Sequence, residues 1–183
     1  DPADGKTRDP FLLYEAADGG EFELDPEGSA PAGGPSGLFQ LATAVFEPGV
    51  TIDGGFSGAW FNPADNGQGF DVEIVGNAAG SLTLAVAWFT TDIQGNAFWV
   101  QGAAAIDPAK GYVVVPVRAA RTGSRFGPFF DPAEITDQPW GYLVFTFQDC
   151  DNGTVYYGSN FGFGTAEYPI QRITTIAQTE CEV

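Results

Sequence analysis

The sequence predicts an all-β protein, an antiparallel sandwich or barrel of about nine strands preceded by an extended N-terminal arm. Short apolar runs, several with a clean two-residue alternation, recur along most of the 183 residues. Stretches rich in Gly, Pro, Asn and Asp separate these runs at the spacing of β-hairpins. No stretch shows the periodicity of an amphipathic helix, and 25 Gly and 13 Pro residues favour turns over helices.

The composition divides the chain into two parts, residues 1–37 and residues 38–183. The first part is an arm that ends in GSAPAGGPSG (28–37), a small, Gly- and Pro-rich linker. The arm carries six apolar residues that we expect to take part in an interaction: Phe11, Leu12, Leu13, Tyr14, Phe22 and Leu24. The second part is the β-sandwich or barrel domain.

The strands of the main domain are predicted from its apolar runs. Residues 69–75, GFDVEIV, show the clearest alternation, with Phe70 and Val72 on one face and Asp71 and Glu73 on the other. The other expected strands are 39–46, 81–90, 96–105, 111–118, 140–148, 153–159 and 168–176. Asn and Gly supply the left-handed backbone positions of tight turns at 77–80, 92–96, 107–111 and 150–153.

Two segments interrupt this pattern. Pro116 lies inside the run 111–118, and because proline cannot donate to a ladder, it predicts an edge strand or a bulge there. An edge strand would leave the sheet open to a partner. Residues 131–140, DPAEITDQPW, are expected to form one helical turn that ends by Pro139.

The composition excludes several classes of function. With 24 acidic against 7 basic residues and a formal net charge of −17, nucleic acid and anionic membranes are poor partners. No apolar run approaches ~18 residues, so no membrane insertion is expected. The absence of His removes Ser-His-Asp and Cys-His nucleophiles and His-ligated metals. Phosphate-loop and dinucleotide-binding motifs are also absent. We therefore expect no enzyme activity.

The two cysteines, Cys150 and Cys181, are expected to form a disulfide in an oxidising compartment, where it would contribute about 3–4 kcal/mol. The alternative is a pair of buried thiols. The sequence also contains no Met, which we interpret as a sign of a processed, exported chain or of a chain cut at a chosen boundary.

Five motifs between Ser57 and Thr174 resemble a domain of uncharacterised secreted proteins and lipoproteins of proteobacteria: SGAWFNPADNGQGFDVEIV, AWFTTDIQGNAFWVQG, FGPFFDP, WGYLVFTFQDCDNGTVYY and GFGTAEYPIQRIT. The resemblance implies a β-rich bacterial domain, extracellular or at the cell surface, with no established enzyme activity. The series Gly58-x-Trp60-x-Asn62, followed by a Gly-rich turn, also resembles the first hairpin of avidin-type barrels, a likeness that concerns architecture alone.

Acidic residues suggest two kinds of site. Asp149, Asp151 and Asn152, before Gly153, resemble half of a calcium loop, and calcium is the one cofactor that the sequence suggests. The alternative is that these residues only cap their own turn. Carboxylates that lie near aromatic residues could form a hydrolytic pair: Asp65, Asp71, Glu73, Asp92 and Asp131.

The 16 Phe, 6 Tyr and 4 Trp residues suggest a surface that stacks on sugar rings, and the candidates are Trp60, Phe89, Trp99 and Trp140. Adjacent aromatics in AWFT (87–90) and AFWV (97–100) must face opposite sides of a strand. One residue of each pair therefore belongs to the core. The alternative for the whole set is core filling.

These observations support three hypotheses. The first is a non-enzymatic extracellular structural or assembly protein, a filament or appendage subunit that forms a homo-oligomer or polymer through strand addition by the arm. An arm that packs on its own domain is the alternative within this hypothesis. The second is a secreted module that binds a glycan or another small ligand in a groove with exposed aromatics. The third is a carboxylate-pair hydrolase.

Overall fold

The computed structural model describes residues 12–14, 23–25, 50–122, 127–160 and 162–182. Two short strands, β1 (Leu12–Tyr14) and β2 (Glu23–Asp25), pair antiparallel with each other as a separate two-stranded sheet. The expected linker at 28–37 and the expected strand at 39–46 lie outside the described residues.

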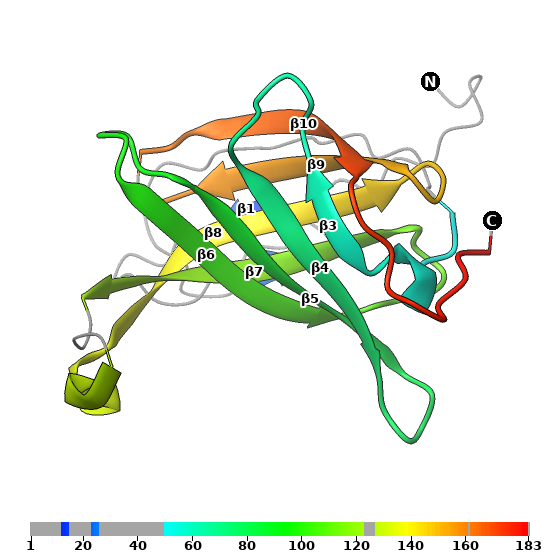
Figure 1. The fold of residues 1–183 in the computed structure, drawn as a ribbon, viewed down its shortest axis with the longest axis horizontal. Coiled ribbons are helices and arrows are strands. Elements are labelled where there is room, and N and C mark those ends of the chain that lie inside the picture. The colour runs from blue at the N-terminus through cyan, green and yellow to red at the C-terminus, as the bar shows by residue number, and fades with distance from the viewer. Residues whose placement is uncertain (1–11, 15–22, 26–49, 123–126, 161, 183) are drawn as a thin grey trace.

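Eight antiparallel strands form a closed barrel (Figure 1): β3 (Gly58–Phe61), β4 (Gly69–Gly76), β5 (Leu82–Thr91), β6 (Ala97–Ala105), β7 (Tyr112–Thr122), β8 (Thr136–Phe147), β9 (Asn152–Ser159) and β10 (Thr165–Arg172). Strands consecutive in sequence are neighbours, and β10 returns to pair with β3. The structure confirms the all-β prediction and, of its two alternatives, selects the barrel.

The remaining regular structure in the described residues is three single turns of 3-10 helix, η2 (Gly54–Phe56), η3 (Gly127–Phe129) and η4 (Pro132–Glu134). The turn expected within 131–140 is η4, and it ends before Pro139, which lies in β8. No helix in the described ranges has the length and apolar character needed to cross a membrane.

The alternating pattern of the sequence places the core inside the barrel. Phe70 and Val72 of β4 are buried, whereas Asp71 and Glu73 point outward. The interior is filled by side chains from all eight strands, which is typical of a barrel of this strand number. The same alternation fixes which residues form the outer surface, and the candidate site described below lies on that surface.

Two of the eight ladders are very short. Within the described residues, β6 pairs with β7 only at Gln101–Arg118 and Gly102–Val117, and β10 pairs with β3 only at Gln171–Phe61 and Arg172–Trp60. The β5–β6 ladder, by contrast, runs from Thr83–Ala105 to Thr91–Ala97. These two shortest ladders of the closed barrel are called here the β6–β7 seam and the β10–β3 seam.

Pro116 lies beside the β6–β7 seam. The prediction that it marks an edge strand is wrong, because β7 has β6 on one side and β8 on the other. The alternative prediction of a bulge agrees with the structure, since the β7–β8 register shifts between Val117 and Arg118. Pro116 stands just beyond the last β6–β7 residue pair, so its missing N–H removes no hydrogen bond from that short ladder.

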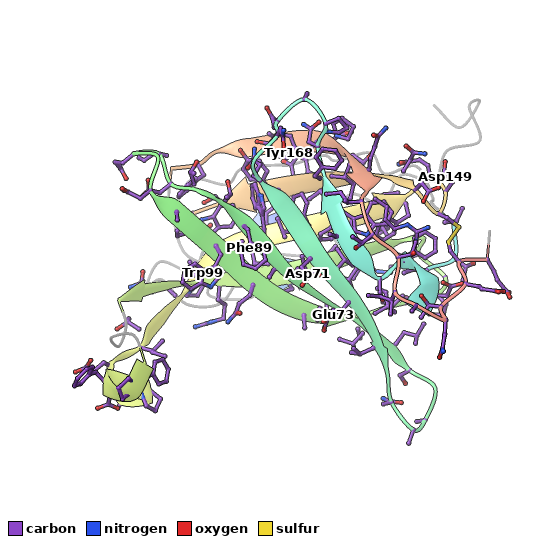
Figure 2. The ribbon with its side chains drawn as sticks, in the orientation of Figure 1. Asp71, Glu73, Phe89, Trp99, Asp149 and Tyr168 are labelled. Atoms are coloured by element: carbon purple, nitrogen blue, oxygen red, sulfur yellow. A yellow bond between two sulfur atoms is a disulfide. The ribbon has the colours of Figure 1, made fainter. Side chains whose placement is uncertain are left out.

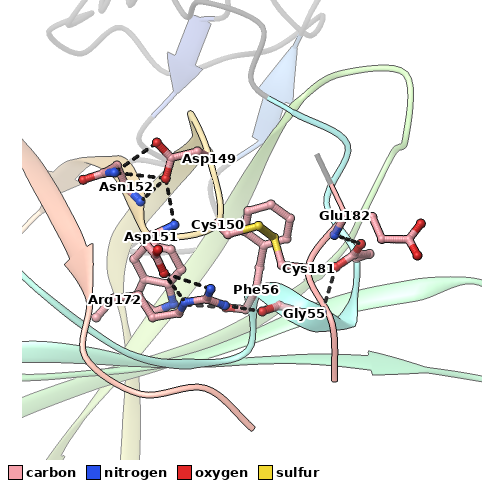
Figure 3. Close-up of a disulfide and its surroundings, with 11 residues drawn as sticks. Gly55, Phe56, Asp149, Cys150, Asp151, Asn152, Arg172, Cys181 and Glu182 are labelled. Atoms are coloured by element: carbon pink, nitrogen blue, oxygen red, sulfur yellow. Dashed lines mark hydrogen bonds and ion pairs between the residues drawn. A yellow bond between two sulfur atoms is a disulfide. The ribbon is translucent and has the colours of Figure 1, made fainter. Parts of the chain in front are cut away.

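The β10–β3 seam is held by Arg172 (Figure 3). Its guanidinium donates to Asp151 Oδ1 from Nε at 3.1 Å and from Nη2 at 3.0 Å, and Nη1 donates to the Gly55 carbonyl. The guanidinium carbon lies 5.7 Å from the centre of the Trp60 ring. The Arg172 side chain is only 7% exposed, so these contacts satisfy a charge that would otherwise be buried alone.

The predicted disulfide joins Cys150, between β8 and β9, to Cys181 near the C-terminal end, with Cα atoms 5.8 Å apart. It lies at the same end of the barrel as η2 (Figure 3). A side chain at Gly55 would overlap the backbone of Cys181, so the C-terminal segment packs directly on η2. Ile52 and Phe56 are buried beneath it and close this end of the barrel.

Gly102 is required for the β6–β7 seam, because a Cβ there would overlap the carbonyl oxygen of Pro116. We expect Gly102→Ala to lower the free energy of unfolding by about 1–3 kcal/mol. The matched control is Gly76→Ala, since the nearest atom to a Cβ at Gly76 is Leu82 Cδ2 at 3.6 Å. Urea denaturation of both variants measures the difference. Equal stability of the two variants would contradict the close approach at the seam.

Candidate functional site

The outer face of β4, β5, β6 and β7 carries a regular array of side chains. The ladders align Asp71 with Ala87, Ala87 with Gln101, and Gln101 with Arg118, so one row crosses four strands. All four residues point outward, because they alternate with buried neighbours on each strand. This row places a carboxylate, a methyl group, an amide and a guanidinium side by side.

The two adjacent rows complete the array. On one side, Glu73 is aligned with Ala85. On the other side, Gly69 is aligned with Phe89, and Phe89 is aligned with Trp99. Figure 2 shows Asp71, Glu73, Phe89 and Trp99 along the face of the barrel turned toward the viewer.

A hollow of about 500 Å³ lies on this face, and we call it the outer trough. Its floor is formed by small residues of β5 and β6, because alanine and glycine leave the backbone uncovered. Its walls are polar and come from β4 on one side and from β6 and β7 on the other. The lining residues are Asp71, Glu73, Ala85, Val86, Ala87, Gln101, Gly102 and Arg118.

Two exposed aromatics continue the floor of the outer trough. Phe89 is 55% exposed and Trp99 is 49% exposed, although both side chains are large and apolar. They are directly opposite each other in the β5–β6 ladder, and each is two residues from a trough residue on its own strand. Gly69, their neighbour on β4, adds no side chain that could cover Phe89. We call Phe89 and Trp99 the aromatic shelf.

The chemistry of the outer trough combines hydrogen-bond acceptors and donors. Asp71 and Glu73 are exposed carboxylates on the β4 wall. Gln101 offers both an acceptor and donors, and Arg118 offers donors only. Because Asp71 and Glu73 are two residues apart on one strand, their Cα atoms are separated by about 7 Å along one wall. A ligand on the trough floor would meet both carboxylates from the same side.

The four aromatic surface candidates separate into two groups. Trp60 and Trp140 are 0% and 1% exposed, so the prediction that they lie at the surface is wrong. They occupy inward-facing positions of β3 and β8, and their rings fill the barrel. Phe89 and Trp99 point outward, while their sequence neighbours Trp88 and Val100 are buried.

The residues suggested as calcium ligands form the β8–β9 turn. Asp149 Oδ1 accepts hydrogen bonds from the backbone N–H groups of Asp151 and Asn152, both at 2.8 Å. Asn152 Nδ2 donates to both Asp149 oxygens at 3.0 Å, and Asp151 pairs with Arg172 (Figure 3). Calcium ligation here would have to replace these hydrogen bonds. Among the described residues, no group of three or more acidic or cysteine side chains is arranged to hold a metal ion.

Four of the six expected interaction residues of the arm lie in its two short strands. Phe11 and Phe22 lie outside the described residues. The backbones of Leu12, Leu13 and Tyr14 form β1, and that of Leu24 lies in β2. The arm therefore contributes two short paired strands to the structure, and its predicted interaction stays a prediction.

Gln101 and Arg118 were not predicted as members of the candidate site. Each lies on the polar side of an alternating run, where a solvated residue is the ordinary expectation. They could have been identified from the strand register of three consecutive hairpins. That register aligns Asp71 with Ala87 on β5, Gln101 on β6 and Arg118 on β7.

Comparison of the chain with protein-family models, curated proteins and solved structures gives no match. The function of the outer trough is therefore argued from its own geometry.

The hydrogen bonds of the β8–β9 turn predict an acid-sensitive group. The Asp151 backbone N–H and the Asn152 side chain hold the pKa of Asp149 below its usual 3.8. A lowered folded-state pKa contributes stability that is present above the unfolded pKa and is lost as the pH falls through the folded pKa. We expect an NMR titration of the Asp149 carboxyl to have its midpoint below 3.8, and Asn152→Ala to raise it. A midpoint at 3.8 in both proteins would contradict the turn geometry.

Proposed function

We propose that this protein is a non-enzymatic binding module that holds a glycan, or a similar hydroxyl-rich small ligand, in the outer trough. The observation that carries the proposal is the continuity of the aromatic shelf with a hollow whose walls present acceptors and donors. Exposed apolar surface rimmed by polar groups is typical of a binding site. Phe89 and Trp99 are adjacent across the β5–β6 ladder, so they form a continuous apolar patch rather than single scattered residues.

A hydroxyl-rich ligand matches the trough chemically. Each sugar hydroxyl can both donate and accept, so it can donate to Asp71 or Glu73 and accept from Gln101 or Arg118. The apolar face of a sugar ring can lie on Trp99, as apolar groups generally do on exposed indoles. A strongly anionic ligand is a poorer match, because the protein carries a net charge of −17.

Binding without turnover is supported by the position of the carboxylates. A glycosidase places its two carboxyl groups on either side of the scissile bond. Here Asp71 and Glu73 come from the same wall, and the opposite wall is formed by Gln101 and Arg118. The Cys150–Cys181 disulfide supports an extracellular or cell-surface location for such a module, since disulfides persist in oxidising compartments.

Assembly through the N-terminal arm is a second candidate function. Each barrel strand has a neighbour on both sides, so the barrel has no edge strand for the arm to join. The observation in its favour is the separate β1–β2 sheet, in which each strand pairs only with the other among the described residues. An unpaired strand edge can accept a strand from a second molecule.

A binding measurement with the aromatic shelf removed tests the glycan proposal. We expect Trp99→Ala to weaken binding of a glycan found on an array by about tenfold or more, because a stacked ring loses its platform. Ala87→Leu should weaken it similarly by filling the trough floor. Phe130→Ala is the matched control, since Phe130 is 57% exposed on another part of the surface. Isothermal calorimetry measures all three variants.

Two outcomes would contradict the glycan proposal. One is an array on which the wild-type protein binds no glycan. The other is binding that Trp99→Ala and Ala87→Leu leave at the wild-type affinity. Incubation of the bound glycan with the protein, followed by analysis of product length, tests the hydrolase alternative, and shortened products would overturn the non-enzymatic assignment.

Deletion of residues 1–36 tests the assembly candidate. If the arm joins molecules, the intact protein has an oligomeric mass in light scattering and the deletion variant has the mass of one chain. An identical monomeric mass for both proteins would exclude assembly by the arm, while glycan binding by the barrel would remain intact.

A further inference from the structure

The two ends of the barrel interior differ in how they are closed. At the disulfide end, Ile52 and Phe56 are buried and seal the interior. At the opposite end, the inward-facing side chains are only half-buried, although they belong to the same interior. We call this end the barrel mouth, and it comprises Thr90, Phe98, Phe163 and Tyr168.

Beneath the barrel mouth lies a layer of packed aromatic rings. The ring of Trp88 contacts Trp140 edge-to-face, with centroids 5.7 Å apart, and lies 5.3 Å from Tyr157. Phe163 covers Trp140 at 5.4 Å and stacks on Phe98 at 5.5 Å. An apolar ligand that entered the mouth would therefore meet ring surfaces on all sides.

This layer contains two hydrogen-bond donors without acceptors. Trp88 Nε1 and Trp140 Nε1 are buried and have no partner, and they are the two such side-chain atoms in the part of the chain that the structure describes. Burial alone does not leave an indole N–H without an acceptor in this protein, as Trp60 shows. Trp60 is equally buried, but its Nε1 donates to the Phe56 carbonyl at 3.0 Å. A buried donor without an acceptor costs free energy, so an acceptor within reach of either indole N–H would be stabilising.

The surrounding side chains do not supply that acceptor. The Tyr157 hydroxyl donates to the Phe163 carbonyl at 3.2 Å. The Thr90 hydroxyl donates to Gln68 Oε1 at 2.7 Å, and neither it nor the Tyr157 hydroxyl accepts from the two indoles. The basic side chains that the structure describes, Lys110, Arg118 and Arg172, lie elsewhere. Among the described side chains, an anion in this apolar layer would thus have no basic partner.

We propose that the barrel mouth is a second binding site, independent of the outer trough, for a compact, neutral, apolar molecule that carries a carbonyl oxygen. Its ring or hydrocarbon body packs among Phe98, Tyr157 and Tyr168, and its oxygen accepts from the Trp88 and Trp140 indoles. Mouths of eight-stranded barrels are wide enough to hold one small ligand. To reach the indoles, the ligand takes the position of the Phe163 ring. Gly162 and Gly164, which flank Phe163, have φ of +78° and +72°, so the backbone on both sides of that ring is glycine, and the ring is held by its contacts with Trp140 and Phe98 alone among the ring contacts of the described residues.

The experiment follows the four indole N–H signals of the full chain in a ¹H–¹⁵N NMR spectrum, assigned with single Trp→Phe variants. Acetophenone is the neutral carbonyl probe, ethylbenzene has a similar shape without an acceptor, and benzoate is an anionic acceptor. We expect acetophenone to shift the Trp88 and Trp140 signals downfield and saturably, and to leave the hydrogen-bonded Trp60 signal unchanged. Ethylbenzene and benzoate should bind about tenfold more weakly or worse, because each lacks one required property.

Phe163→Ala provides a gain-of-binding test that does not depend on disrupting the core. Removal of the covering ring should tighten acetophenone binding several-fold, whereas Phe130→Ala should leave it unchanged. The proposal is overturned if acetophenone shifts neither the Trp88 nor the Trp140 signal saturably, or if only the exposed Trp99 responds. It is also overturned if ethylbenzene binds as well as acetophenone, or if Phe163→Ala has no effect on affinity.

Discussion

The barrel can close only because two backbones approach each other directly at each short seam. A Cβ at Gly102 would overlap the Pro116 carbonyl, and a Cβ at Gly58 would overlap the Thr174 carbonyl. Each seam pairs only two residues on each strand, and at the β10–β3 seam the bonds from Ile173 N–H to the Ala59 carbonyl and from Ala59 N–H to the Thr174 hydroxyl add to these pairs. Because glycine has no Cβ, the two backbones can approach each other closely at each seam, although the ladders there are short. The positions of the core and of the outer face both follow from this closure.

The two seams have different consequences. At the β10–β3 seam, Arg172 joins η2, the β8–β9 turn and Trp60, so that end of the barrel is locked together with the disulfide. Beside the β6–β7 seam, the outer surface of β4, β5, β6 and β7 forms the hollow. The barrel is therefore held together at its disulfide end and has a concave polar surface on its side.

Much of the fold could be predicted from local pattern, and much of the site could not. Alternation in residues 69–75 gave the correct inward and outward faces of β4, because a two-residue period is a local property. β3 was not predicted as a strand, since its four residues are too few to show alternation. Trp60 and Trp140 were surface candidates with core filling as the alternative, because the sequence does not show which way they face until the barrel closes. The row from Asp71 to Arg118 depends on three ladder registers and a seam, which no single segment encodes.

The central claim is that the outer face of β4–β7 is the functional surface. A map of backbone amide chemical-shift changes on addition of a bound oligosaccharide tests it most directly, because it reports every contact surface at once. The largest changes should centre on Ala87 and Gln101 and extend to Phe89, Trp99 and Arg118. Changes centred instead on the exposed Phe129–Phe130 segment, or on β1 and β2, would contradict the claim.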